Sequence, residues 1–135
     1  MTYDELNIGD SATFEKTITE TDVYGFAGII GDFNPAHVNA RKMAGTKFGQ
    51  RIAHGMLSGS LFSTIFGTKL PGEGSIYLSQ SLNFLAPVFF GDTILATVTV
   101  KEKLEKGRVK FECTAAKEDG TVVVSGEAVL LPPRE

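Results

Sequence analysis

The chain has 135 residues, of which 42% are hydrophobic and 21% charged, a balance typical of a globular domain rather than of a disordered segment. Thirteen basic and sixteen acidic side chains give a net charge of −3, which argues against a broad surface for nucleic acid. The single cysteine, Cys113, excludes an intrachain disulfide and fits a reducing cytoplasm, where we expect the protein to reside. We therefore predict one domain over residues 1–135 and no nucleic-acid partner.

The residue pattern of the N-terminal part of the chain predicts a strand followed by a helix. Ala12 to Ile18 has the character of a strand. Thr19, with Asp22 three residues later, is typical of the start of a helix, because the threonine can cap it and the acid favours its first turn. The next apolar residues recur at helical spacing: Val23, Phe26, Ala27 and Ile30.

The segment after this helix is expected to be a loop. Gly31 can end the helix in a left-handed conformation, and Pro35 disfavours helical geometry in the residue before it. Residues Asp32 to His37 are therefore expected to be non-helical, and a short basic helix is expected over residues 39–44.

The stretch from Ile52 to Thr68 contains no Asp, Glu, Lys or Arg. Its length is at the lower limit for crossing a bilayer, but it carries His54 and several small or hydroxyl residues. We therefore predict a buried helix from Gly55 to about Gly67, enclosed on every side by the rest of the protein, and no membrane partner.

The C-terminal half predicts four strands at the spacing of a meander. Turns are expected at Pro71–Gly74, at Lys106-Gly107 and at the two-residue hairpin signal Asp119-Gly120. The strands' apolar residues are Ile76, Leu78, Leu82 and Phe84; Ala96, Val98 and Val100; Val109, Phe111, Cys113 and Ala115; and Val122, Val124, Ala128 and Leu130. These features predict an α+β fold with a bent antiparallel sheet around the buried helix, and a sheet edge where a second copy could pair.

The expected loop places an acid, an amide and an imidazole within six residues, as Asp32, Asn34 and His37. General acid–base chemistry needs two such groups within reach of one water or substrate atom. An ordinary turn stabilised by Asp32 would explain the first residues equally well, so both interpretations stay open.

His54 and Gly55 directly precede the buried helix. A helix start presents free backbone N–H groups, and a glycine there lets an oxygen approach closely, so this point suits an oxyanion or enolate. A close-packed glycine beside a core histidine is the alternative. Ser63, two turns later, is a weaker candidate, because most serines in buried helices bond to their own backbone.

Neither a metal nor a cofactor is predicted. Two histidines and one cysteine without paired spacing do not form a typical metal site, and no phosphate-binding or dinucleotide motif is present. Cys113 lies on an alternating apolar strand, which indicates a role in core packing.

Several segments resemble a known family. Tyr24 to His37 is similar to the hydratase-2 motif of MaoC-like (R)-specific enoyl-CoA hydratases, and Ala53 to Leu57 is similar to the second landmark of that family. Ser75 to Phe84 and Pro87 to Asp92 resemble the strand and turn that follow. The closest resemblance is to short bacterial members that supply (R)-3-hydroxyacyl-CoA for polyhydroxyalkanoate synthesis.

This resemblance implies a hot-dog fold, a homodimer and a trans-2-enoyl-CoA substrate held in a tunnel near the dimer interface. It implies that Asp32 and His37 are the catalytic pair and that no cofactor is needed. Substrate binding and stabilisation of the enolate oxygen are expected from Gly55, Asn34, Ser63 and His54, with the Gly55 N–H as the main donor.

Three alternatives remain at this point. A 3-hydroxyacyl-[acyl-carrier-protein] dehydratase would use Arg41, Lys42, Lys47 and Arg51 for docking, although these side chains could also meet coenzyme A phosphates. A hot-dog acyl-CoA thioesterase is less favoured, because many of these enzymes carry a carboxylate on the long helix and this helix has none. A non-catalytic module that binds acyl thioesters would not need Asp32 or His37.

Overall fold

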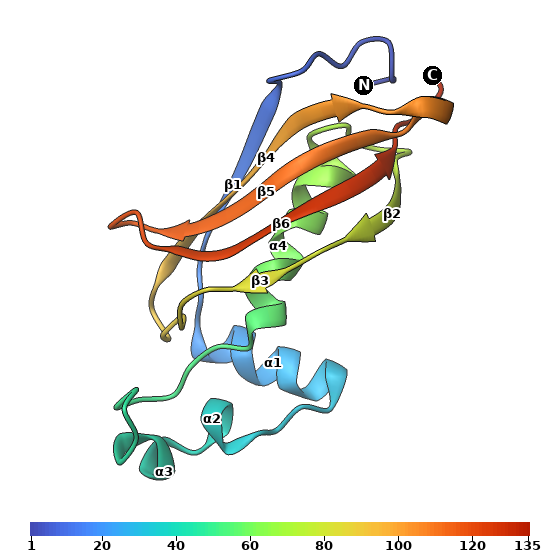
Figure 1. The fold of residues 1–135 in the computed structure, drawn as a ribbon. Helices are drawn as coiled ribbons and strands as arrows, with labels where there is room; N and C mark the ends of the chain where they lie inside the picture. The colour runs from blue at the N-terminus through green and yellow to red at the C-terminus, as the bar shows by residue number, and fades with distance from the viewer.

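The computed structural model describes residues 1–135 and contains one antiparallel sheet with helices on one side of it (Figure 1). The strand order is β1-β4-β5-β6-β2, and the short β3 also pairs with β6. The strands are β1 (Ser11–Thr17), β2 (Ile76–Gln80), β3 (Asn83–Phe84), β4 (Thr93–Lys103), β5 (Val109–Lys117) and β6 (Val122–Leu131). The helices are α1 (Glu20–Ile30), α2 (Pro35–Val38), α3 (Ala40–Ala44) and α4 (Gly55–Thr68), with a short 3-10 turn at Glu105–Gly107.

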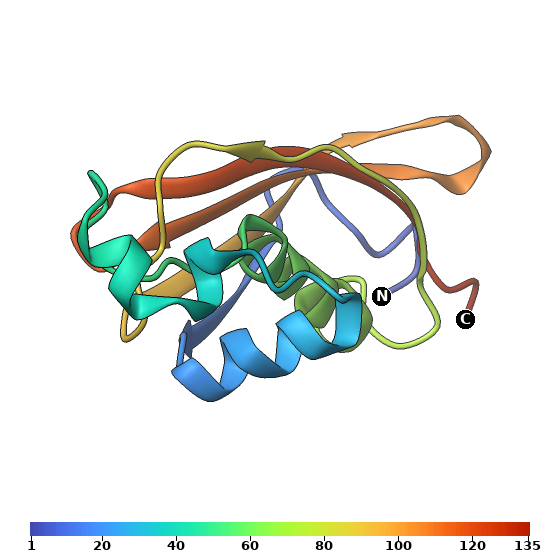
Figure 2. The ribbon, with the colours of Figure 1, turned by 90° about the horizontal axis from the view of Figure 1, so that it is seen from below.

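The sheet bends over α4 without closing into a barrel, which confirms the expected hot-dog fold (Figure 2). The apolar face of α4 supplies Leu57, Leu61, Phe62, Ile65 and Phe66 to the core. The sheet contributes alternating residues from its concave face. None of the helices has both the length and the apolar character that crossing a bilayer requires.

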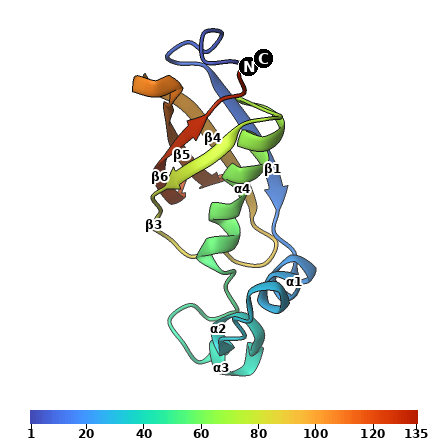
Figure 3. The ribbon, with the colours of Figure 1, turned by 90° about the vertical axis from the view of Figure 1, so that its right-hand side faces the viewer.

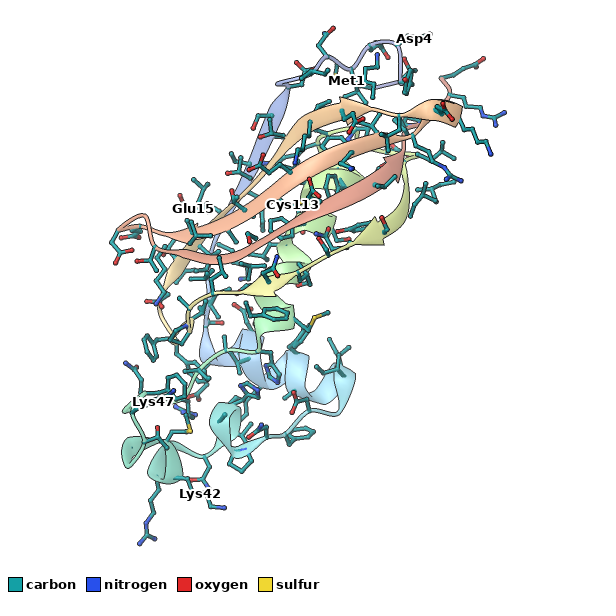
Figure 4. All side chains as sticks on the ribbon, in the orientation of Figure 1. Met1, Asp4, Glu15, Lys42, Lys47 and Cys113 are labelled. Atoms are coloured by element: carbon teal, nitrogen blue, oxygen red, sulfur yellow. The ribbon has the colours of Figure 1, made fainter.

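Cys113 lies in the middle of the sheet and is fully buried (Figure 4), so the predicted packing role is confirmed. Its neighbours on the same face of β5, Val109, Phe111 and Ala115, are also fully buried.

Helices α1, α2 and α3 gather at one end of the molecule, whereas both termini lie at the other end (Figure 3). The predicted start of α1 is confirmed, because Thr19 and Asp22 form a reciprocal capping box. Its predicted end is confirmed too: Gly31 is left-handed, with φ of 78°, and its N–H bonds to the Ala27 carbonyl at 2.8 Å.

The prediction of a four-strand meander was wrong for the first strand. β4, β5 and β6 are consecutive hairpins, but β2 pairs with β6 rather than with the strand that follows it. The hairpin after β5 is also longer than predicted, because the Lys117 N–H bonds to the Thr121 carbonyl and three residues lie between them. A register shift opposite Ala115 and Ala116 then turns Val122 outward, so that it does not share the buried face of Val124 as regular alternation would require.

Two predictions about the helices need correction. The Asp32 to His37 segment is not entirely non-helical, since Pro35 begins a single helical turn that contains His37. Within one chain α4 is covered on one side only. Its other side exposes Met56, Ser60, Ser63 and Gly67.

Candidate active site

The loop after α1 is shaped by two side chains that bond to nearby backbone. The Asn34 N–H donates to Asp32 Oδ1 at 3.1 Å, and the Ala36 N–H donates to Asn34 Oδ1 at 3.0 Å. Asn34 therefore caps the N-terminus of α2, and Pro35 occupies the first helical position, where its missing N–H costs nothing. Asn34 acts on the loop through these contacts, and the other carboxylate oxygen of Asp32 stays free for chemistry.

His37 is held by the carbonyl of Ile52. Its Nδ1 lies 2.7 Å from that oxygen, and because a carbonyl only accepts hydrogen bonds, Nδ1 carries the hydrogen. The opposite ring nitrogen, Nε2, lies 3.8 Å from Asp32 Oδ2. That separation is too long for a direct hydrogen bond, but one water oxygen can contact both atoms. The His37 side chain is 10% exposed and that of Asp32 is 48% exposed, so solvent reaches the pair from the carboxylate side.

His54 contacts both Asp32 and His37. Its ring stacks on that of His37 with centroids 3.7 Å apart, and the ring of Phe26 packs edge-to-face against the His54 ring, with centroids 5.2 Å apart. His54 Nε2 lies 3.0 Å from the backbone oxygen of Asp32. Because a carbonyl oxygen only accepts hydrogen bonds, Nε2 is the donor. His54 therefore connects the start of α4 to the Asp32 loop and acts through the other two residues.

Asp32, His37 and His54 each offer a possible metal ligand atom, and these atoms lie within 4.8 Å of one another. The ring stacking argues against a shared ion. Imidazole lone pairs lie in the ring plane, and the planes of the two histidines are only 23° apart. The lone pairs therefore run side by side instead of converging on one point, which does not match the tetrahedral geometry that zinc requires.

Gly55 begins α4 next to this cluster. Its N–H has no acceptor within the chain, as expected for the first turn of a helix, while the Leu57 N–H bonds to the His54 carbonyl at 3.0 Å. A Cβ at position 55 would lie 2.5 Å from the ring of Phe84, so only glycine fits here without displacing that ring. The absence of a side chain thus leaves the N-terminus of α4 accessible next to the Asp32, His37 and His54 cluster.

A cavity of about 320 Å³ adjoins Gly55. Its walls come from the segment before α4, from α4 itself, from the chain between β3 and β4, and from β6. Its lining residues are Phe48, Ile52, Ala53, Gly55, Ser58, Phe84, Leu85, Ala86, Pro87, Val88, Val123 and Val124. Asp32 and His37 are not among them, but Ile52, whose carbonyl holds His37, is.

The structure does not bring Ser63 to this cavity. Ser63 lies on the uncovered side of α4 and lines a separate hollow of about 410 Å³ with Phe26, Met56 and Tyr77 among its walls. Within one chain Ser63 therefore does not line the cavity beside Gly55, and its expected role in substrate binding stays a prediction.

The four basic candidates separate into two groups. Arg51 already has partners within the chain, because its guanidinium donates to the Glu20 carboxylate at 2.7 Å and to the Tyr24 hydroxyl at 2.9 Å. Arg41, Lys42 and Lys47 are exposed, and Figure 4 shows the two lysines at the helical end of the molecule. Only the latter three are free to meet a large anionic ligand.

Comparison with known proteins gives the family. The model of the MaoC like domain matches residues 5–122. The chain belongs to the MaoC-like domain family. An (R)-specific enoyl-CoA hydratase of Rhodospirillum rubrum is 50% identical over 97% of this chain and 91% of its own length.

Two solved structures of similar proteins have the same fold as this MaoC-like chain. An (R)-hydratase of Pseudomonas aeruginosa in the unliganded form superposes with a TM-score of 0.95 at 45% identity, over 99% of this chain and 86% of that one. An (R)-hydratase from A. caviae, involved in PHA biosynthesis, gives a TM-score of 0.93 at 41% identity, over 96% of this chain and 98% of that one.

Some parts of this MaoC-like site were not anticipated from the sequence. The Ile52 carbonyl and the Phe26 ring join the histidines only through tertiary packing, and no local motif announces them. Ser58 lies three residues after Gly55, a spacing that is visible in the sequence, but nothing local separates it from the other hydroxyl residues of α4.

Proposed function

We propose that this protein catalyses the reversible (R)-specific hydration of trans-2-enoyl-CoA to (R)-3-hydroxyacyl-CoA, as a hydro-lyase that needs no cofactor. The observation that carries the proposal is the placing of Asp32 Oδ2 and His37 Nε2 3.8 Å apart beside a helix that starts at Gly55. The names of the Rhodospirillum rubrum and A. caviae relatives support the same reaction.

The chemistry follows from these positions. A water held between Asp32 and His37 faces two hydrogen-bond acceptors, so its oxygen can attack the β-carbon of the enoyl thioester while one proton passes to the pair. The electron pair of the double bond moves toward the thioester, whose oxygen becomes enolate-like and is stabilised by the Gly55 N–H. The pair then returns a proton to the α-carbon.

The remaining residues have supporting roles in this proposal. Asn34 holds the loop, and His54 positions both members of the pair. Ser63 would contact substrate only if the hollow on the uncovered side of α4 is completed by another chain. We therefore include a homodimer, with the partner covering that side.

The similarity to the A. caviae hydratase supports a role in the supply of (R)-3-hydroxyacyl-CoA for polyhydroxyalkanoate synthesis. We place the enzyme in the cytoplasm, because its single cysteine fits a reducing compartment.

The test is the loss of the conjugated enoyl absorbance of crotonyl-CoA, with free thiol assayed in parallel and the chirality of the product determined. Asp32→Asn and His37→Gln should each lower kcat/KM by about two to four orders of magnitude, because each removes one member of the acid–base pair. Asp4→Asn is the matched control, since Asp4 lies at the opposite end of the molecule (Figure 4).

The alternatives predict different results in the same experiment. Thiol release without hydration would indicate a thioesterase, and α4 carries no carboxylate to favour that outcome. Hydration of crotonyl-[acyl-carrier-protein] but not of crotonyl-CoA would indicate a carrier-protein dehydratase. Turnover that survives in both variants would refute the assigned pair.

A further inference from the structure

Ser58 is a fully buried serine whose hydroxyl has no hydrogen-bond partner in the protein. A buried polar group without a partner destabilises the fold, so such groups are rare and need an explanation. Ser58 supplies the only polar side chain in the lining of the cavity beside Gly55.

Two other hydroxyl residues of the same helix bond to its backbone. Ser60 donates to the Leu57 carbonyl at 2.6 Å, and Thr68 donates to the Thr64 carbonyl at 2.6 Å. Bonding to the preceding turn is the usual arrangement for serine and threonine within a helix. Ser58 makes no such bond, so its hydroxyl is available to a molecule in the cavity.

The position of Ser58 relative to Gly55 indicates which group it would meet. The two residues are three apart, so they share one face of α4. The Cα–Cβ bond of a helical residue tilts toward the N-terminus, which directs the Ser58 side chain back over the first turn. A single oxygen in front of this turn can therefore accept from both the Gly55 N–H and the Ser58 hydroxyl.

From this arrangement we infer that Ser58 is a second oxyanion donor, which binds the thioester carbonyl oxygen of the acyl substrate together with the Gly55 N–H. The inference rests on the proposed function, because the thioester is that of its substrate. The hydrogen bond strengthens as the oxygen gains negative charge, so its main effect is on the transition state and not on substrate binding.

The kinetic test uses Ser58→Ala and Ser58→Cys, with Thr68→Ala as the matched control on the same helix. Both Ser58 variants should lower kcat for crotonyl-CoA hydration at least tenfold, approaching the roughly hundredfold loss typical of one missing oxyanion donor, with little change in KM. Cysteine has nearly the size of serine but is a weak donor, so it separates hydrogen bonding from packing. Thr68→Ala should keep the wild-type kcat.

A stability measurement distinguishes this role from a structural one. Ser58→Ala removes an unpaired buried hydroxyl, so its thermal midpoint should equal or exceed that of the wild type while its kcat falls. A structural serine would instead lose stability when it is replaced. Loss of stability that parallels the loss of activity in both Ser58 variants would overturn the inference.

A spectroscopic test does not depend on turnover. In an Asp32→Asn background, the infrared carbonyl frequency of bound crotonyl-CoA, labelled with ¹³C at the thioester carbon, should rise when Ser58 is replaced by alanine, because the carbonyl is then less polarised. An unchanged frequency together with an unchanged kcat would overturn the inference.

The two proposals can fail separately. A wild-type protein that binds crotonyl-CoA without hydrating it would refute the proposed function, and the carbonyl frequency would still decide the role of Ser58. A protein that does not bind crotonyl-CoA at all would refute both.

Discussion

His37 and His54 use opposite ring nitrogens for their backbone contacts. His37 donates from Nδ1 to the Ile52 carbonyl, and His54 donates from Nε2 to the Asp32 carbonyl. These tautomers, assigned from their acceptors, leave His37 Nε2 facing the Asp32 carboxylate and His54 Nδ1 buried without a partner. In the proposed mechanism His37 is therefore the histidine that transfers protons and His54 the one that supports it, although both lie in the same stack.

Cys113 is a second buried group with a clear chemical state. Burial raises the pKa of its thiol to about 11 from an ordinary value of 9.0. The neutral thiol is therefore the form in the folded protein, and the thiolate that reacts with oxidants and alkylating reagents is suppressed.

We expect Cys113 to make the fold sensitive to alkaline pH. Because its pKa is raised by folding, its contribution to the free energy of unfolding is complete below pH 9.0 and is lost as the pH rises through about 11. Urea unfolding at pH 8, 10 and 11 should show a steeper loss of stability for the wild type than for Cys113→Ala. Equal slopes would contradict this, as would rapid reaction of the native thiol with a thiol reagent at pH 8.

At the level of elements, α1 sets the position of the Asp32 loop. The helix is defined at both ends, by the Thr19 and Asp22 capping box and by left-handed Gly31, so the loop starts at a fixed point. Burial alone would raise the pKa of Asp22, but hydrogen bonds from the Thr19 N–H and from Lys16 outweigh it and lower the pKa below 3.8. The stabilisation from Asp22 is therefore present at neutral pH and is lost as the pH falls through this lowered value.

We expect Thr19→Ala to lower the free energy of unfolding by about 1 kcal/mol, because the Asp22 N–H loses the hydroxyl that caps it at 3.1 Å. Thr21→Ala is the matched control, since Thr21 is exposed on the same helix and its side chain makes no hydrogen bond. Urea unfolding at pH 7 measures both. A Thr19 variant as stable as the control would show that α1 is held by its packing alone.

At the scale of the whole molecule, one side of the fold, formed by β2 and α4, exposes apolar residues that one chain does not cover. β2 is an edge strand, and its Ile76, Tyr77 and Leu78 are 54%, 39% and 43% exposed. Met56, on the neighbouring uncovered side of α4, is 53% exposed. An exposed apolar sheet edge is prone to pair with another chain, which supports the proposed homodimer.

We expect light scattering coupled to size exclusion to give twice the mass of one chain for the wild type. Leu78→Glu should shift the protein toward the monomer, because it places a charge within the apolar edge of β2. Ile8→Glu is the control, since Ile8 is 68% exposed but lies outside β2 and α4. A wild-type monomer at all concentrations, or equal effects of both variants, would contradict a dimer formed through β2.

Local sequence signals predicted most of the elements because the forces that form them are local. Thr19, Asp22 and Gly31 act within one or two turns of α1. The alternation of apolar and polar residues along β4 and β5 indicates which face of each strand is buried. Pairing of β2 with β6 was not predicted, because the hydrogen bonds join residues about 50 positions apart and several partners satisfy the same alternation. The outward turn of Val122 was missed for a similar reason, since a bulge depends on the partner strand.

In the candidate site, too, some features follow from local sequence and others from tertiary packing. The sequence by itself identified Asp32, Asn34, His37, His54 and Gly55 as candidate site residues, because their spacing and the breaks at Gly31 and Pro35 are local properties. Only the tertiary structure decided that His54 stacks on His37, that Ser63 lies in a different hollow, and that Ser58 is buried beside Gly55. These facts depend on how α4 rotates about its axis against the sheet, and that rotation is set by the packing of the whole core rather than by any short segment.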